Sequence, residues 1–329
     1  MTRLSLRALT RIQGILLVPA ILLLLSGATE LLGQQSSTQP YDVPVVLTRL
    51  DTYTDPTSQR VEPSLKREDL VKDFGPENFQ VQVGGVGAPV QGAAVDKGPK
   101  RVVLVVDASK PVAKTEWEQE IDVLQILLRY ARGNDKFTFV FVGADSATGG
   151  FLSLGETRTY LGKLRAARPA TTDSEARIYD ALLAGANRLD PPQFGDIVVL
   201  VGRIVDSGSK TIVADLTKLF LKNRIRFIGL SLSLPPGFPA SFDPRTSPPP
   251  RYPTPVLAEL SGETGYFTWA GSVGWDYEFL YECIAEPYRL TISTPARQDQ
   301  ALLDIRLLPG SKKKKVDGII FHYPRFIYP

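Results

Sequence analysis

The sequence has few of the side chains that most metal centres and many active sites require. Its 329 residues include one Cys, one His and one Met. The single Cys283 cannot close an internal disulfide, and it excludes Cys-rich zinc and iron–sulfur sites. The single His322 lies close to the C-terminus, so we do not expect a Ser-His-Asp catalytic triad.

Net charge is also scarce. The chain has 38 Lys and Arg against 35 Asp and Glu, a formal charge of +3. The first 33 residues hold three Arg and one Glu, which leaves only +1 for the rest of the chain. Nucleic-acid-binding proteins normally carry a basic stripe on their working face, so we expect no nucleic-acid partner. An apolar fraction of 43% is typical of a folded protein.

The N-terminus has the pattern of an export signal. The first eleven residues hold three Arg and no acid, and the apolar run Ile15–Leu25 follows. Small residues at Ser26–Ala28 offer a signal-peptidase site. We therefore expect residues 1–33 to be a signal peptide that directs the protein to the periplasm, the cell envelope or the medium. The alternative is a permanent anchor, because residues 12–29 are uncharged and just long enough to span a bilayer.

A polar linker at 34–42 and an N-terminal β segment at 43–98 are expected after the leader. Alternating residues predict strands within this segment at Pro44–Leu50 and Asn78–Val83, and the charged stretch between them predicts a short helix or turn over 64–74. The Gly-rich stretch after the second strand lacks the GxGxxG spacing of a nucleotide loop, so we expect a hairpin turn.

The pattern changes at residue 99, where strands begin to alternate with helices. Val102–Val106 is a continuous apolar run, as expected for a strand that is buried on both faces of a sheet. The other strands are expected at 137–142, 150–154, 197–201, 226–232 and 266–269, and the helices at 116–132, 157–168, 174–189, 210–223 and 256–261. This alternation over 99–271 predicts a doubly wound, mostly parallel α/β sheet of the Rossmann type.

Two further segments differ from this pattern. Residues 234–255 contain nine Pro, so they can form neither a helix nor a central strand, and we expect a Pro-rich loop. Residues 272–329 begin with a helix and continue as alternating stretches that predict a β meander. Because neither β segment has enough strands to bury a face alone, the two segments are expected to pair into a small β-sandwich.

Several motifs taken in order resemble a von Willebrand factor A (VWA) domain. They are the strand and turn Val102–Ser109, the helix start Ile178–Leu182 and the strand Ile197–Val201. Two flanking stretches, Asn78–Val81 and Leu257–Phe267, resemble the secreted bacterial VWFA-related group that is common in acidobacterial genomes. The resemblance covers roughly residues 43–329, and it implies protein–protein recognition instead of catalysis.

VWA domains often hold Mg²⁺ between an Asp-x-Ser-x-Ser loop, a Thr and a second Asp. Such a site needs hard oxygen ligands in near-octahedral geometry. The matching positions here supply Asp107 and Ser109, but the third loop position is Pro111 and the Thr position is Ala176. If a metal bound at all, Asp107 and Ser109 would be its ligands. We expect no Mg²⁺ and no other cofactor.

The second Asp position of the family falls on Arg203, and Asp206 lies three residues further on. We hypothesise that Arg203 reaches toward Asp107 and places a positive charge where the metal would sit. The alternative is that Arg203 points to solvent and the site is vestigial. The predicted binding face therefore consists of Asp107, Ser109, Arg203 and Asp206.

Other candidates favour structural roles. Lys312–Lys315 could bind an anionic surface, but a solvated turn is the better interpretation. Asp173 and Glu175 are paired acids with no partner in an unequal environment, which disfavours glycosidase chemistry. Cys283 lies in an apolar helical stretch and is expected in the core, and His322 is expected to be structural or exposed.

Taken together, the sequence predicts an exported module that binds another protein without metal. The alternative is a non-catalytic scaffold or assembly component of the cell envelope. An enzyme is not expected, because no nucleophile–base pair is present.

Overall fold

The computed structural model describes most of the chain after the leader. The described residues are 38–53, 65–110, 112–144, 148–171, 175–202, 206–232, 260–261, 263–264, 268–270, 277–295, 299–308 and 319–329. The expected signal peptide or anchor, the Pro-rich loop and the Lys-rich turn lie outside them. None of the described helices is long and apolar enough to cross a membrane. The chain divides into two compact units, Met1–Gln39 and Pro40–Pro329, and the second unit holds all the described residues except 38 and 39.

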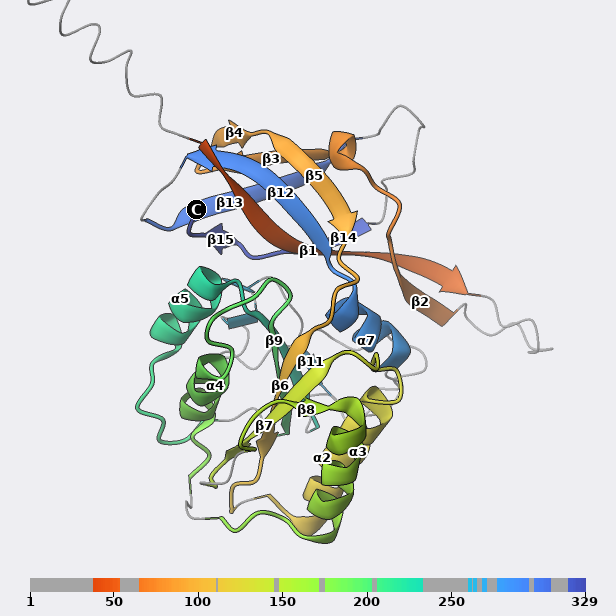
Figure 1. Cartoon of the computed structure of the whole chain (residues 1–329), viewed down its shortest axis with the longest axis vertical. Coiled ribbons are helices and arrows are strands. Elements are labelled where there is room, and N and C mark those ends of the chain that lie inside the picture. The colour runs from red at the N-terminus through yellow and green to blue at the C-terminus, as the bar shows by residue number, and fades with distance from the viewer. Residues whose placement is uncertain are drawn as a thin grey trace, which may run out of the picture. The chain divides into compact units, whose positions relative to one another are not determined.

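A six-stranded sheet forms the centre of the helix-containing α/β part of this second unit (Figure 1). Its strands, in chain order, are β6 (Arg101–Asp107), β7 (Lys136–Val142), β8 (Leu152–Ser153), β9 (Ile197–Gly202), β10 (Arg226–Ser231) and β11 (Thr268–Ala270). They lie side by side in the order β11-β10-β9-β6-β7-β8, and all neighbours are parallel except β7 and β8. The chain order reverses between β6 and β9, which is the switch point of a doubly wound sheet.

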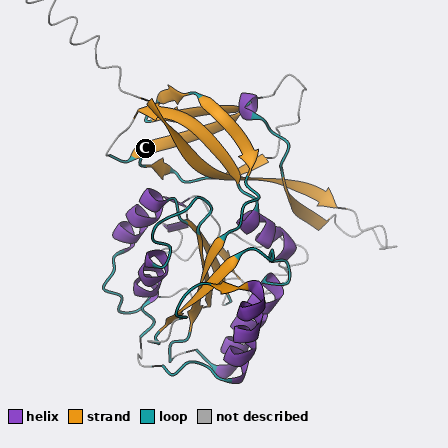
Figure 2. Ribbon diagram, in the orientation of Figure 1, coloured by secondary structure: helices purple, strands orange, loops and turns teal. Residues whose placement is uncertain are grey.

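Helices cover both faces of this sheet (Figure 2). They are α2 (Lys114–Leu127), α3 (Leu154–Ala166), α4 (Ile178–Asn187), α5 (Val213–Asn223) and α7 (Tyr277–Ala285). Val102, Leu104 and Val106 of β6 pack with α2, α3 and α7, whereas Val103 and Val105 pack with α4 and α5. Because alternate side chains of one strand enter two apolar clusters, β6 must be apolar throughout. The predicted doubly wound, mostly parallel sheet is confirmed.

The remaining strands form two antiparallel sheets. These strands are β1 (Thr38–Tyr53), β2 (Leu65–Leu70), β3 (Phe79–Val83), β4 (Val86–Ala88), β5 (Val90–Val95), β12 (Tyr288–Pro295), β13 (Ala301–Leu307), β14 (Ile319–His322) and β15 (Phe326–Ile327), with a 3-10 turn at Pro76–Asn78. One sheet has the order β14-β1-β12-β5 with β2 on β1, and the other has the order β15-β13-β3-β4. N-terminal and C-terminal strands therefore pair with each other, and both sheets contribute side chains to one apolar cluster.

Two expectations for these strands are wrong. The stretch expected to form a helix or turn contains β2, which pairs antiparallel with β1 so that Asp69 lies opposite Arg49 and Arg67 lies opposite Asp51. Charged residues occur in strands as well as in turns, so charge alone does not distinguish the two. The C-terminal strands are not a meander, because β12 pairs with β5, β13 pairs with β3 and β14 pairs with β1. Alternation predicts a strand but does not specify its partner.

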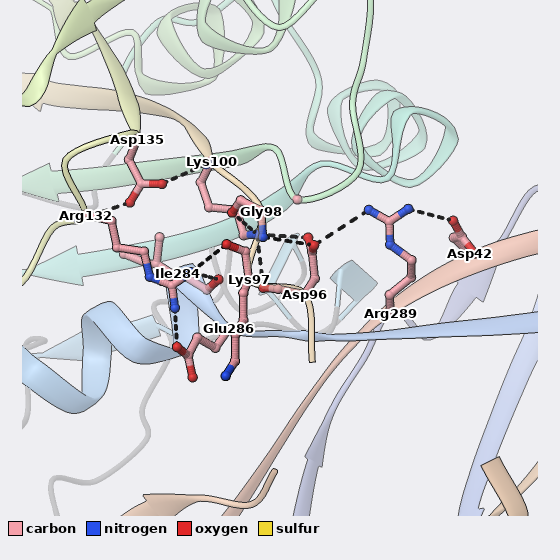
Figure 3. A network of polar contacts seen from close by, with 12 residues as sticks. Asp42, Asp96, Lys97, Gly98, Lys100, Arg132, Asp135, Ile284, Glu286 and Arg289 are labelled. Atoms are coloured by element: carbon pink, nitrogen blue, oxygen red, sulfur yellow. Dashed lines mark hydrogen bonds and ion pairs between the residues drawn. The ribbon is translucent and has the colours of Figure 1, made fainter. Parts of the chain in front are cut away.

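Two short chain segments, 96–100 and 286–287, connect the antiparallel sheets to the α/β part, and a polar network surrounds both (Figure 3). The Glu286 carboxylate pairs with Arg132 of the α/β part and, at 2.5 Å, with Lys72 of the segment that follows β2. The two connecting segments and the ion pairs of Glu286 thus lie close together.

These contacts lie at the amino-terminal ends of the parallel strands. Lys100 directly precedes β6, and Arg226, which is fully buried, begins β10. The Arg226 guanidinium donates to the carbonyl oxygens of Cys283 at 3.0 Å, Ile284 at 2.6 Å and Gly195 at 3.0 Å. Because the strands are parallel, their carboxyl ends lie at the opposite edge of the sheet, away from these contacts.

Candidate functional site

Asp107 and Ser109 lie at the carboxyl end of β6, beside the switch point. Ser109 donates to the Oδ1 atom of Asp107 twice, from its backbone N at 3.0 Å and from its hydroxyl at 2.6 Å. The backbone N of Ala108 donates to the carbonyl of Val142 at 3.1 Å, which fixes the turn against β7. Asp107 is 0% exposed and Ser109 is 1% exposed. Both side chains therefore shape the loop from within the protein, whereas the neighbouring Lys110 is exposed.

Two glycines allow the neighbouring strand ends to approach this turn. Gly202, which ends β9, has a φ of +133°, and a Cβ placed there would lie 2.6 Å from Asp107 Cβ. Gly143, which follows β7, has a φ of +74°, and its Cβ would lie 2.7 Å from Ser109 Cα. Any larger residue would be strained by its backbone conformation and would collide with the turn. The ends of three adjacent strands therefore converge on one point.

Glu120 of α2 also reaches this point, although sequence analysis did not select it. The residue is 1% exposed, and a Cβ on Gly202 would lie 2.9 Å from its Oε1 atom. Two buried carboxyl groups, those of Asp107 and Glu120, thus flank Gly202. The sequence does indicate that Glu120 is buried. Glu120 lies three residues after Trp117 and four before Leu124, and so it falls on the apolar face of its helix.

Asp206 has a different role from the one expected of a binding-face residue. Its Oδ1 atom accepts from the backbone N of Tyr179 at 3.2 Å and from the Ser209 hydroxyl at 2.5 Å. Asp206 therefore caps the start of α4 from a neighbouring loop. Ala176 is buried beside the same helix start and offers no side-chain oxygen.

A second carboxylate of this region is held in the same way. The side chain of Asp180 accepts from the backbone N of Lys210 at 3.2 Å and of Thr211 at 2.8 Å. Burial raises the pKa of Asp180, but these hydrogen bonds outweigh it, and the pKa lies below its usual range. The loop before α5 is thereby tied to the start of α4.

Several oxygen atoms near this turn make contacts within the protein. Among the parts of the chain that the structure describes, no group of three or more His, Cys, Asp or Glu side chains could hold a metal ion. The Ser109 hydroxyl donates to Asp107, and Asp206 caps a helix, so these oxygens are used within the protein. Arg203 and Pro111 lie outside the described residues.

The other sequence candidates do not join this site. Cys283 is buried in the core on α7, as expected. His322 of β14 is also buried, and its Nε2 atom lies 3.3 Å from the Thr48 hydroxyl of β1. Glu175 is about half exposed and pairs with Arg177 at 3.5 Å, whereas Asp173 lies outside the described residues.

Arg168, which follows α3, is a further residue that sequence analysis missed. Its guanidinium donates to backbone carbonyls of the loop after β6. No motif in the sequence connects Arg168 to that loop, because the two lie about 60 residues apart in the chain. The contact emerges only when α3 packs beside α2.

Comparison with known proteins gives similarities of fold. No protein-family model and no curated protein matches the sequence. Among solved structures, the chain is similar to proximal thread matrix protein 1 from the mussel byssus, with 12% identity and a TM-score of 0.46 over 61% of this chain and 50% of that one. It is also similar to the conserved hypothetical protein BatB from Bacteroides thetaiotaomicron (13% identity, TM-score 0.40, 57% of this chain and 97% of that one).

A third similar structure is the SpRpn10 VWA domain, with 13% identity and a TM-score of 0.31 over 41% of this chain and 75% of that one. The alignments span only 38% and 50% of the two mussel-protein chains. With such low identities and with TM-scores below 0.5, these similarities assign no function to the chain.

Proposed function

We propose that this chain is an exported VWA-type module that binds another protein through the carboxyl-end face of its parallel sheet, without a divalent metal and without catalysis. The observation that carries the proposal is the buried Asp107–Ser109 turn at the switch point, where doubly wound sheets bind their ligands. We interpret the two antiparallel sheets as a β-sandwich that is attached at the opposite edge, which leaves this face accessible.

The proposal replaces a metal ion at the turn with a side-chain cation. Asp107 and Glu120 are both buried beside Gly202. A guanidinium is the side-chain cation that pairs best with a carboxylate. Arg203 follows Gly202 in the sequence, and we propose that its guanidinium supplies this positive charge.

Calorimetry with Mg²⁺ and with Mn²⁺ tests metal independence. We expect the wild-type chain to show no micromolar binding of either ion. Arg203→Asp, which restores the acid of the family's pattern, is expected to gain measurable affinity. Micromolar binding by the wild type that disappears in Asp107→Asn would contradict the proposal.

Partner binding tests the face itself. After a partner has been isolated from the native envelope and purified, Lys110→Glu and Arg203→Glu are expected to weaken its affinity by roughly tenfold or more. The matched control is Leu302→Lys, because Leu302 is 48% exposed on β13, far from Asp107. This control is expected to bind normally.

The scaffold interpretation remains a second candidate, because N-terminal and C-terminal strands are interleaved in the same sheets and the polar network ties them to the α/β part. A scaffold that assembles through its β sheets would give the opposite result, with Leu302→Lys defective and Lys110→Glu normal. The same two variants therefore separate the two functions.

Export is a proposal that rests on the leader sequence. N-terminal sequencing of the mature protein from its native source is expected to find cleavage shortly after Ala28. Recovery of the intact N-terminus in the membrane fraction would instead indicate a permanent anchor formed by residues 12–29.

A further inference from the structure

We propose that Arg168 is the positioning residue of the binding loop, and that its guanidinium holds this loop in one shape. The binding loop is defined here as residues 108–110 together with Val112. The inference rests on the proposed function for its biological meaning, but its physical content can be tested without a partner.

Arg168 contacts the binding loop at both of its ends. One terminal nitrogen donates to the carbonyl of Val112 at 2.7 Å. The other donates to the carbonyl of Ala108 at 2.6 Å and also to the carbonyl of Ser109. One planar guanidinium thus binds three backbone oxygens of the loop. A lysine ammonium would be a poor substitute, because its donors all lie on one nitrogen.

The position of Arg168 is itself fixed by the neighbouring helix. Its guanidinium carbon lies 5.7 Å from the ring centroid of Trp117 on α2. The Trp117 indole nitrogen in turn donates to the carbonyl of Leu164 on α3 at 3.0 Å. Trp117 therefore restrains the Arg168 guanidinium from α2 and is itself bonded to α3. We call the contacts of this guanidinium with the binding loop the clamp.

The clamp completes a set of internal restraints on the binding loop. Ser109 donates two hydrogen bonds to the Asp107 carboxylate, and Gly143 packs against the Ser109 backbone. The Arg168 guanidinium binds the backbone carbonyl oxygens of the same loop. A loop ordered in advance loses less conformational entropy when a partner binds, so these restraints would favour binding.

Amide hydrogen exchange measured residue by residue by NMR tests the clamp. The reporters are the backbone N–H groups of Ser109, which donates to Asp107, and of Val112, which donates to the Ser109 carbonyl at 3.0 Å. In Arg168→Ala, we expect both amides to exchange roughly tenfold faster or more, while the β6 amides keep their protection. Arg168→Lys is expected to lie between the wild type and Arg168→Ala.

The matched control is Arg158→Ala. Arg158 lies on α3, ten residues before Arg168, and its guanidinium also donates to a backbone carbonyl, that of Leu128, at 2.8 Å. Its removal is expected to leave the binding-loop amides unchanged. Equal acceleration in both variants would mean that α3 is merely loosened, and it would overturn the proposal.

Chemical rescue tests whether the guanidinium group itself orders the binding loop, or whether the Arg168 side chain only adds packing. Millimolar guanidinium chloride is expected to restore protection to the two reporter amides of Arg168→Ala, whereas the same concentration of sodium chloride is not. No rescue, or no acceleration in the variant, would overturn the clamp while leaving the proposed binding function open. If Arg168→Ala does not fold, Arg168→Lys serves as the test variant, and unchanged exchange in it would likewise overturn the proposal.

Discussion

Single residues at the strand ends decide whether the candidate site can form. Gly202 and Gly143 have positive φ values, and each lies too close to the Asp107–Ser109 turn for a side chain. The sequence shows these glycines but not the contact, because Gly202 approaches Asp107 across about 95 residues of chain. Glu120, by contrast, could have been found from its place on an apolar helix face.

We expect Gly202→Ala to destabilise the protein by about 2–4 kcal/mol. The new Cβ would lie 2.6 Å from Asp107 Cβ, and the φ of +133° is unfavourable for alanine. Urea denaturation at neutral pH measures the loss. The control is Gly162→Ala in the interior of α3, where no atom lies within 4 Å of the added Cβ. There we expect a gain of about 0.5–1 kcal/mol.

At the scale of elements, hydrophobic periodicity identified the strands and helices of the α/β sheet well. It failed for β2, whose charges resemble those of a turn, and for the pairing of the C-terminal strands. Both failures have the same cause: a strand's partner depends on contacts between segments distant in sequence. The attachment of α7 shows this too, because a buried arginine of β10 binds its last carbonyls.

We expect Arg226→Met to destabilise the protein by about 2–5 kcal/mol. The methionine fills part of the space but leaves the buried carbonyls of Cys283, Ile284 and Gly195 without this donor. Urea denaturation measures the effect, and faster amide exchange at the end of α7 should accompany it. The control is Arg129→Met, which makes the same substitution at an exposed arginine. It is expected to change the free energy of unfolding by less than about 0.5 kcal/mol.

At the scale of the whole described molecule, Glu286 links the β sheets to the α/β part. Burial raises the pKa of Glu286, but its contacts with Lys72 and Arg132 outweigh burial and hold the pKa below its usual value of 4.5. A lowered pKa means that the ion pairs stabilise the fold above the unfolded-state pKa. That stabilisation is lost as the pH falls through the folded-state pKa.

We therefore expect the free energy of unfolding to fall less steeply below about pH 4.5 in Glu286→Gln than in the wild type. Urea denaturation of both proteins at pH 7 and at pH 3.5 measures how far the free energy of unfolding falls in each. At pH 7 the variant is expected to be less stable than the wild type. Glu278→Gln, at an exposed position on α7, is the control. Equal pH dependence of Glu286→Gln and the wild type would show that the Glu286 ion pairs contribute no stability.

The alternation of strands and helices could be predicted from the sequence, and with it the doubly wound sheet and the position of Asp107 and Ser109 at a strand end. These features follow from periodicity within short stretches of the chain. The pairing of the strands, the capping of a helix by Asp206 and the gathering of Glu120, Gly202 and Arg168 around the turn became visible only in the folded structure. Those outcomes depend on close packing between distant segments, and no local pattern records such contacts.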